Sequence, residues 1–447
     1  MATDPTARTR TFARRSPYDR DIWRLALPAF GALVAEPLYR LTDTAVVGHL
    51  GTEELAGLTL ANAVLATGFA VFIFLAYGTT QAVARLIGAG EHARAAHQAV
   101  QSLWLAVALG VGLAGVLWLT SDPLIGLLGG DGEVADHAMT YLRVSVLGLP
   151  ATFVILAGTG YLRGLQDTRT PLFVAVGTAL VNLVLEVWWI FGLDFGIGAS
   201  ALSTVSAEVL AAAVYVTMIR RATRQHATPW RPDRRVIAGL GRAGVALFVR
   251  TAALRGSFTL ATAVAARIGT ADLAAHQIAF EVMFLLALSL DAVAIAGQAL
   301  TGRYLGAGDA GSARAAGRRM IEWSVVAGVV VGLLLAAVSQ VLPDAFTDDP
   351  EVLAIAGFLL LWVAALQPLN GLVFALDGVL IGAGDLTFLA KAMVLAFAVF
   401  TPAAVAVLTL DLGIGWVWAS IALLFVARGA VLTWRFAGDR WLRLGAD

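Results

Sequence analysis

The chain has 447 residues, of which 59% are hydrophobic and only 14% are charged. This composition is too apolar for a water-soluble domain of that length, so it excludes soluble enzymes and nucleic-acid-binding domains and indicates an integral membrane protein. The formal net charge is zero and cysteine is absent, which excludes disulfides and cysteine-ligated metal centres.

Twelve apolar stretches, each long enough to cross a hydrocarbon core of roughly 30 Å, predict twelve transmembrane helices. We expect them at 22–46, 54–86, 96–120, 134–160, 170–191, 197–220, 237–264, 272–303, 318–342, 352–380, 387–409 and 414–436. Residues 1–21 carry five arginines without an apolar core, so they are predicted to be a cytoplasmic tail rather than a cleaved signal peptide, and residues 437–447 form a second tail.

The charged residues of the loops alternate in sign along the chain. Arginine gathers at every second loop, most densely between Arg220 and Arg235, whereas acidic residues such as Glu53, Asp131 and Asp349 occupy the loops between. Because basic loops stay in the cytoplasm, both termini are expected on the cytoplasmic side of the plasma (inner) membrane, and an even number of helices agrees with this.

The two halves of the sequence repeat each other at a nearly constant offset of 218 residues. Arg85, Gly88 and Gly90 correspond to Arg303, Gly306 and Gly308, Pro150 to Pro368, and Gly164 with Asp167 to Gly382 with Asp385. We therefore predict an all-α membrane protein with two six-helix lobes, 22–220 and 237–436, joined by a cytoplasmic linker at 221–236. Since each half has an even number of crossings, the lobes are related by a pseudo-two-fold axis along the membrane normal, as in many transporters.

No motif supplies chemical energy or catalysis. The only lysine, Lys391, follows an alanine, so a phosphate-binding loop of the Walker type is absent, and no nucleophile, metal or acid–base set is recognisable. We expect neither an enzyme nor a cofactor, and uphill transport must then draw on an ion gradient.

Ionisable residues inside the bilayer are costly and are usually retained for function. Asp43 lies in the first helix, while Asn182 and Glu186 lie one turn apart in the fifth. A carboxyl in the membrane can take up and release a proton, and an asparagine beside it can complete an oxygen site for Na⁺, so this set is the predicted coupling site for either ion. A salt bridge from Arg40 to Asp43 that only fixes the helix is the alternative.

Other polar residues in the spans are candidates for the substrate pathway or for gating. They are Glu36, Tyr39, Arg40, Arg250, Arg255, Glu281, Asp291 and Asp377. Among them we expect Glu36 to pair with Arg40, and Arg250 and Arg255 to hold Glu281 or Asp291.

The string from Leu41 to Gly51, LTDTAVVGHLG, resembles the first-helix motif of the multidrug and toxic compound extrusion (MATE) family, DinF-type branch. The string from Arg163 to Thr168, RGLQDT, and the AAHQ string ending at Gln277 support the resemblance, which extends over essentially the whole chain. It implies a twelve-helix antiporter that exports amphipathic, often cationic, compounds in exchange for H⁺ or Na⁺, with Asp43 central to coupling. Glu186 stands where this branch usually has aspartate, and Arg40 stands where a small or apolar residue is expected.

The predicted function is therefore cation-coupled export of small organic molecules by alternating access, with membrane lipid and a small-molecule substrate as the only expected partners and a monomer as the functional unit. The alternative is a flippase for a lipid-linked precursor. The cleft of such a flippase needs several cationic groups to bind a pyrophosphate, and Arg250 and Arg255 are the main candidates in this sequence.

Overall fold

The computed structural model describes residues 16–193 and 195–446, with the side chains of 67–71 left aside. Most of the expected N-terminal tail, including four of its arginines, lies outside the described residues. Within them the chain forms fourteen α-helices and three short helical turns, and no strand. The expected all-α fold is confirmed.

The first half contains eight of the fourteen helices. They are α1 (Asp19–Gly48), α2 (Thr52–Ala70), α3 (Phe74–Gly88), α4 (His92–Leu127), α5 (Gly132–Val146), α6 (Leu149–Gly164), α7 (Arg169–Val187) and α8 (Ile197–Gln225). The second half contains α9 (Arg234–Ile268), α10 (Thr270–Gly306), α11 (Ala310–Val338), α12 (Pro350–Gly382), α13 (Leu386–Thr409) and α14 (Ile414–Ala437). The short turns are η2 (Val71–Ile73), η3 (Trp188–Gly192) and η4 (Leu342–Ala345).

Two of the twelve expected crossings are broken, and both lie in the first half. The stretch predicted at 54–86 is α2 and α3 joined by the turn η2, and the stretch predicted at 134–160 is α5 and α6, bent by 48°. Nine described helices are long and apolar enough to cross a membrane alone, and the bent pair makes ten. With α1 and the α2–α3 pair, twelve crossings result.

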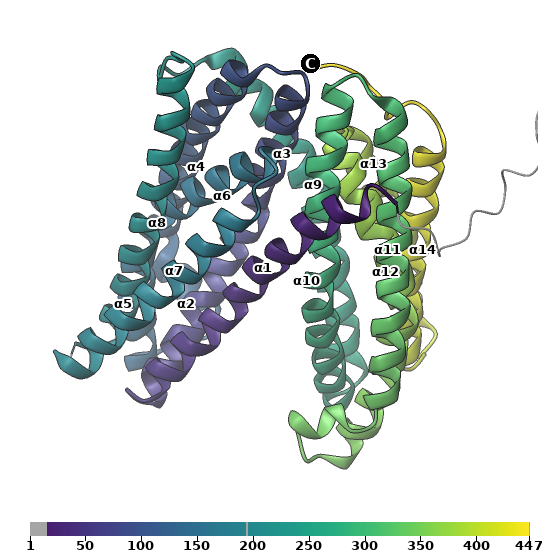
Figure 1. Ribbon diagram of the computed structural model, residues 1–447. Helices are drawn as coiled ribbons and strands as arrows, with labels where there is room; N and C mark the ends of the chain where they lie inside the picture. Colours follow the sequence, from purple (N-terminus) through teal and green to yellow (C-terminus); the bar gives the residue numbers. More distant parts are fainter. Residues whose placement is uncertain (1–15, 194, 447) are drawn as a thin grey trace, which may run out of the picture.

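The helices form two lobes, one from α2 to α8 and the other from α9 to α14 (Figure 1). The lobes lie side by side at the end of the bundle where the chain terminates, here called the tail end, and diverge toward the opposite, open end (Figure 1). Helix α1 runs obliquely between them, so it is the element placed to connect their movements.

Helix α1 is anchored to the second lobe at its beginning and to the first lobe at its end. Asp19 accepts hydrogen bonds from the Arg319 guanidinium at 2.6 and 3.0 Å, and the ring of Trp23 packs edge-on against Trp323 at 5.3 Å. In its last two turns, α1 instead reaches α8, where Asp43 meets Ser200. Pro28 and Pro37 lie inside the helix between these two anchorages, and a proline removes a helical hydrogen bond.

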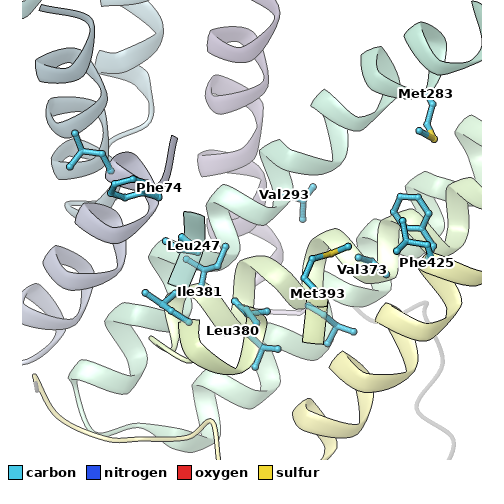
Figure 2. Packing of buried hydrophobic residues seen from close by; sticks show 14 of the residues in the cluster. Phe74, Leu247, Met283, Val293, Val373, Leu380, Ile381, Met393 and Phe425 are labelled. Atoms are coloured by element: carbon cyan, nitrogen blue, oxygen red, sulfur yellow. The ribbon is translucent and has the colours of Figure 1, made fainter. Parts of the chain in front are cut away.

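The tail end is closed by close backbone contacts between α3 and α10. Two equivalent contacts occur, one from each half of the sequence repeat. A side chain at Gly88 of α3 would overlap the carbonyl of Arg303 on α10, and one at Gly306 would overlap the carbonyl of Arg85. Only glycine therefore allows α3 and α10 to approach so closely. Deeper along this seam, Phe74 of α3 belongs to the same buried cluster as Leu247 of α9 (Figure 2).

The guanidinium of Arg85 fastens the same seam. It donates to the carbonyl of Ala383 at 2.9 Å and to the carbonyls of Arg443 and Gly445, both at 2.8 Å, in the segment after α14. Its repeat counterpart, Arg303, donates in the opposite direction across the seam to the side-chain oxygen of Gln166. The two arginines thus form reciprocal bonds between the lobes.

The linker is shorter than expected and lies against the first lobe. Helix α8 extends to Gln225 and α9 begins at Arg234, so only eight residues lie between them. Trp104 of α4 donates to the carbonyl of Trp230 at 2.9 Å, which holds the linker in place. The backbone N–H groups of Arg235 and Val236 lower the pKa of Asp233, which caps the start of α9.

Candidate functional site

A cavity of about 370 Å³ lies inside the first lobe and opens along α1. Its walls come from α1, α2, α3, α5, α6, α7 and α8, and Asp291 of α10 contributes from the second lobe. Apolar and aromatic side chains dominate the walls, with a small number of ionisable groups among them. This size and this lining are typical of sites for small organic molecules.

Asp43 lies on the wall of this cavity and is only 4% exposed. Its Oδ1 accepts a hydrogen bond of 2.7 Å from the hydroxyl of Ser200 on α8. Tyr141 of α5 and Glu186 of α7 also lie close enough to interact with the carboxyl. Asp43 is therefore surrounded by groups from three other helices.

Glu186 lies behind Asp43 and is fully buried. Ser200 directs its hydroxyl to Asp43, and no described residue donates a hydrogen bond to either carboxyl oxygen of Glu186. Two neighbouring carboxyls in an apolar wall repel each other when both are ionised. A proton or a metal cation is needed to make this arrangement favourable.

Asn182, one turn before Glu186, faces α8 rather than the two carboxyls. Its amide nitrogen donates to Ser203 at 3.0 Å and to Thr204 at 3.1 Å. The hydroxyl of Tyr39 also meets Thr204, at 2.6 Å. Asn182 and Tyr39 thus connect α7 and α1 to the same hydroxyl group.

Glu36 and Arg40 form the expected ion pair, at 2.7 Å, on an exposed face of α1. The pair leaves Asp43 without a hydrogen bond from Arg40, so the alternative of an Arg40–Asp43 salt bridge is not seen. Deeper in the cavity, Glu208 accepts a hydrogen bond of 2.7 Å from Thr152.

The expected pairing in the second lobe is wrong. Arg250 pairs with Asp377 of α12 instead of Glu281 or Asp291, and Arg428 of α14 binds the same carboxyl. Arg255 and Glu281 are exposed, and Glu281 accepts a hydrogen bond from Gln277 on its own helix at 3.1 Å. The i, i+4 spacing within one helix was readable from sequence, whereas the contacts of Arg250 depend on how three helices pack.

Asp291 is the second-lobe candidate that does reach the cavity. Its carboxyl accepts from the hydroxyl of Tyr77 on α3 at 3.4 Å. This contact joins the lobes beside the cavity. Asp377, by contrast, does not line the cavity.

Several residues of the site are not among the site candidates predicted from the sequence. They are Tyr141, Thr152, Arg163, Ser200, Ser203 and Thr204. Serine and threonine are common in membrane helices and often bond only to their own backbone, so their type does not mark them. The GAS motif preceding Ala201 places Ser200 one turn before Ser203 and Thr204, a weak indication of a polar stripe on α8.

One group of side chains in the described part of the chain has the geometry of a metal site. Ligand atoms of Glu53, Glu133 and His137 lie within 4.8 Å of one another at the open end. Both carboxylates are exposed, and the adjacent Glu133 raises the pKa of Glu53. Exposed acidic groups commonly gather without a metal, and the group lies away from the cavity wall.

Comparison with known proteins identifies the duplicated fold. The MatE family model matches the chain twice, at residues 28–188 and 246–406, once in each half. The chain belongs to the MATE family. It is therefore a multi-pass membrane transporter and not an enzyme, as the sequence predicts.

Named relatives of this MATE protein cover nearly its whole length. Protein DETOXIFICATION 44, chloroplastic, from Arabidopsis thaliana is 33% identical over 438 residues, which cover 93% of this chain and 81% of the relative. DNA damage-inducible protein F of Escherichia coli (strain K12) is 28% identical over 428 residues, covering 93% and 92%. The bent form of the Vibrio cholerae MATE transporter VcmN shares the fold with a TM-score of 0.86 at 20% identity, covering 95% and 97%.

Proposed function

We propose that this MATE protein exports small amphipathic, often cationic, organic compounds by antiport with H⁺ or Na⁺. The observation that carries the proposal is the pair of buried carboxyls, Asp43 at the cavity wall and Glu186 behind it, with the hydroxyl of Ser200 directed to Asp43. The names of relatives, such as the probable multidrug resistance protein NorM of Rhizobium meliloti, support export of organic compounds.

Coupling follows from the position of the two carboxyls beside the substrate cavity. A bound proton or Na⁺ offsets their repulsion and allows α1 to pack on α7 and α8. Loss of that cation restores the repulsion and favours a different packing of α1. A bound cation shifts the equilibrium between the two packings of α1 only if it binds one packing more tightly than the other. The two carboxyls provide this difference in affinity, because they lie close together in only one of the packings.

The lobes, 22–220 and 237–436, rock about the linker at 221–236 in the proposed cycle. The arginine-rich loops and both termini face the cytoplasm, because the basic loops gather at the tail end. The tail end is sealed and the lobes diverge at the other end, so the described conformation faces outward. The monomer contains the complete cavity and the complete carboxyl pair, and it is the proposed functional unit in the plasma membrane.

The test is uptake of a fluorescent cationic dye into proteoliposomes under an imposed pH or Na⁺ gradient. We expect one gradient to drive uptake by the wild type, and we expect Asp43→Asn and Glu186→Gln to reduce the gradient-driven rate at least about tenfold, because an amide cannot exchange a proton or hold Na⁺ as a carboxylate does. The effective gradient identifies the ion.

Asp122→Asn is the matched control, because it also changes a carboxyl to an amide but at an exposed site paired with Arg143. It is expected to transport like the wild type. Gradient-driven uptake that is unchanged in a folded Asp43→Asn variant would show that coupling lies elsewhere, and no uptake by the wild type under either gradient would contradict export of cationic dyes.

A further inference from the structure

Arg163 is an arginine that the cavity surrounds. The basic loop after the fourth predicted helix begins here, yet the structure places Arg163 in the last turn of α6 with only 9% of its surface exposed. Its side chain lines the cavity. A charge in such a place is costly unless something pairs with it.

No hydrogen bond or ion pair joins the guanidinium of Arg163 to another of the described residues. The other deeply placed arginines differ from it in this respect. Arg250 and Arg428 share Asp377, Arg85 holds backbone carbonyls, and Arg435 binds Asp385. Arg163 therefore keeps its planar set of donors available on the cavity side.

The ionisable groups that act on Arg163 are two tyrosines and one carboxyl. Tyr77, Asp291 and Tyr215 act on its charge, but none comes within ion-pair or hydrogen-bond distance. Asp291 already accepts the hydroxyl of Tyr77, at 3.4 Å. Tyr215 accepts from Thr159 at 3.0 Å and keeps its own hydroxyl hydrogen to donate.

Arg163 and Asp43 lie at different ends of the cavity. Arg163 lies at the end of α6 toward the sealed tail end, whereas Asp43 lies near the end of α1. The cavity follows α1 from Ala32 to Asp43, about 16 Å at 1.5 Å per residue. A molecule lying along this cavity meets Asp43 at one end and the guanidinium of Arg163, with Asp291 acting on it, at the other.

We propose that Arg163 is a substrate-binding residue that recognises a carboxylate, so that the preferred substrates are organic molecules carrying a carboxylate at one end of an apolar or cationic body. A guanidinium binds a carboxylate through two parallel N–H···O bonds, which a methyl ester cannot accept in the same charged form. The inference rests on the proposed export function and specifies the substrate class of the same cavity.

The experiment compares two xanthylium dyes that differ only in having a free carboxylate or its methyl ester. Initial rates are measured in proteoliposomes under the driving gradient, for the wild type, Arg163→Gln and Arg163→Lys. We expect the wild type to have the lower KM for the carboxylate dye. Arg163→Gln should raise the ratio of the two KM values, carboxylate over ester, by about tenfold, and Arg163→Lys should raise it less because lysine keeps the charge but not the planar donors.

Arg143→Gln is the matched control, since it removes an arginine that is exposed on α5 and lies outside the cavity. Its KM ratio should equal that of the wild type. If Arg163→Gln slows both dyes equally, or leaves the ratio unchanged, Arg163 does not recognise the carboxylate and the proposal is overturned.

Binding of the two dyes to the purified protein, followed by fluorescence anisotropy, separates this proposal from the export function. Selective loss of carboxylate-dye affinity in Arg163→Gln supports the role of Arg163 even if the wild type transports neither dye, a result that would count against the export function alone. Equal dye affinities in the wild type and Arg163→Gln overturn the role of Arg163. Thermal unfolding of each variant shows whether it is folded.

Discussion

Asp377 is held between two arginines in the interior of the second lobe. Arg250 of α9 and Arg428 of α14 both bind its carboxyl, and the side chains of Asp377 and Arg428 are almost fully buried. Internal cations thus occupy the carboxyl, which argues for a structural role and leaves the first lobe as the place for a mobile cation.

Replacing Asp377 should therefore damage stability. Asp377→Asn leaves two buried guanidiniums without a counter-charge, and removing one partner of a buried pair costs about 3–5 kcal/mol. We expect the free energy of unfolding, measured by denaturation in mixed micelles, to fall by roughly that amount.

Asp439→Asn provides the comparison for this prediction. Asp439 also pairs with an arginine, Arg314, but its side chain is 86% exposed. Exposed pairs contribute about 0–1 kcal/mol, so this variant should be nearly as stable as the wild type. If Asp377→Asn and Asp439→Asn have equal free energies of unfolding, the internal ion pairs of Asp377 do not stabilise the fold.

At the scale of residues, the sequence predicts the types of group better than their partners. Asp43 and Glu186 could be singled out because carboxyls in apolar stretches are rare, and both are buried, Asp43 at the cavity wall and Glu186 behind it. The pairing of Arg250 could not be predicted, because it depends on the rotation and relative height of packed helices. The cavity-facing position of Arg163 was not predicted either, because the expected helix ends at residue 160, whereas α6 continues to Gly164.

At the scale of helices, the two repeats differ in continuity. The crossing formed by α2, η2 and α3 is broken in the first lobe, while its counterpart α10 is one unbroken helix of 37 residues. Likewise α5 and α6 are bent where α12 continues through Pro368. The first lobe, which holds the cavity, therefore has the greater number of places where a helix can change direction.

The contact between α3 and α10 makes a prediction about conformation. Valine at Gly88 or Gly306 would overlap a carbonyl of the other helix, so either variant should prevent closure of the tail end and favour the inward-facing state. The absence of native cysteine allows a single cysteine at Ala175, on the cavity wall, to be labelled without background. In Gly88→Val and Gly306→Val, we expect an impermeant maleimide added outside to label this cysteine severalfold more slowly than in the protein with native glycines.

Gly112→Val tests whether any added side chain has this effect. Gly112 lies in α4 with no other atom within contact distance of an added Cβ, so labelling at Ala175 should proceed at the wild-type rate. Unchanged labelling in both Gly88→Val and Gly306→Val would mean that the seam tolerates a wider separation of the helices.

The broken helices were not predictable from local sequence. Pro150 and Pro368 occupy equivalent positions in the repeat, yet a bend occurs only before Pro150, at Leu147 and Gly148. A proline at this position is thus not enough to bend the helix. The packing of each lobe decides whether the helix continues. The twelve crossings themselves were predictable, because length and hydrophobicity set them.

At the scale of the whole molecule, the distribution of charge predicts an orientation in the membrane that can be measured. A single cysteine at Thr228, in the linker, should be labelled by an impermeant reagent only after the membrane is opened, because basic loops face the cytoplasm. One at Asp348, in the loop between η4 and α12, should be labelled in intact cells. The reverse pattern would invert the proposed topology and make the described conformation inward-facing.

The seal at the tail end also determines which part of the molecule a pH change acts on. Arg85 donates to backbone carbonyls, Arg303 donates to a neutral amide, and the glycine contacts involve no ionisable side chain. Arginine stays charged throughout the physiological range, so these bonds keep the same strength at any cellular pH. If the driving ion acts at Asp43 and Glu186, as proposed, a change of coupling ion from H⁺ to Na⁺ requires no change in the contacts that close the tail end.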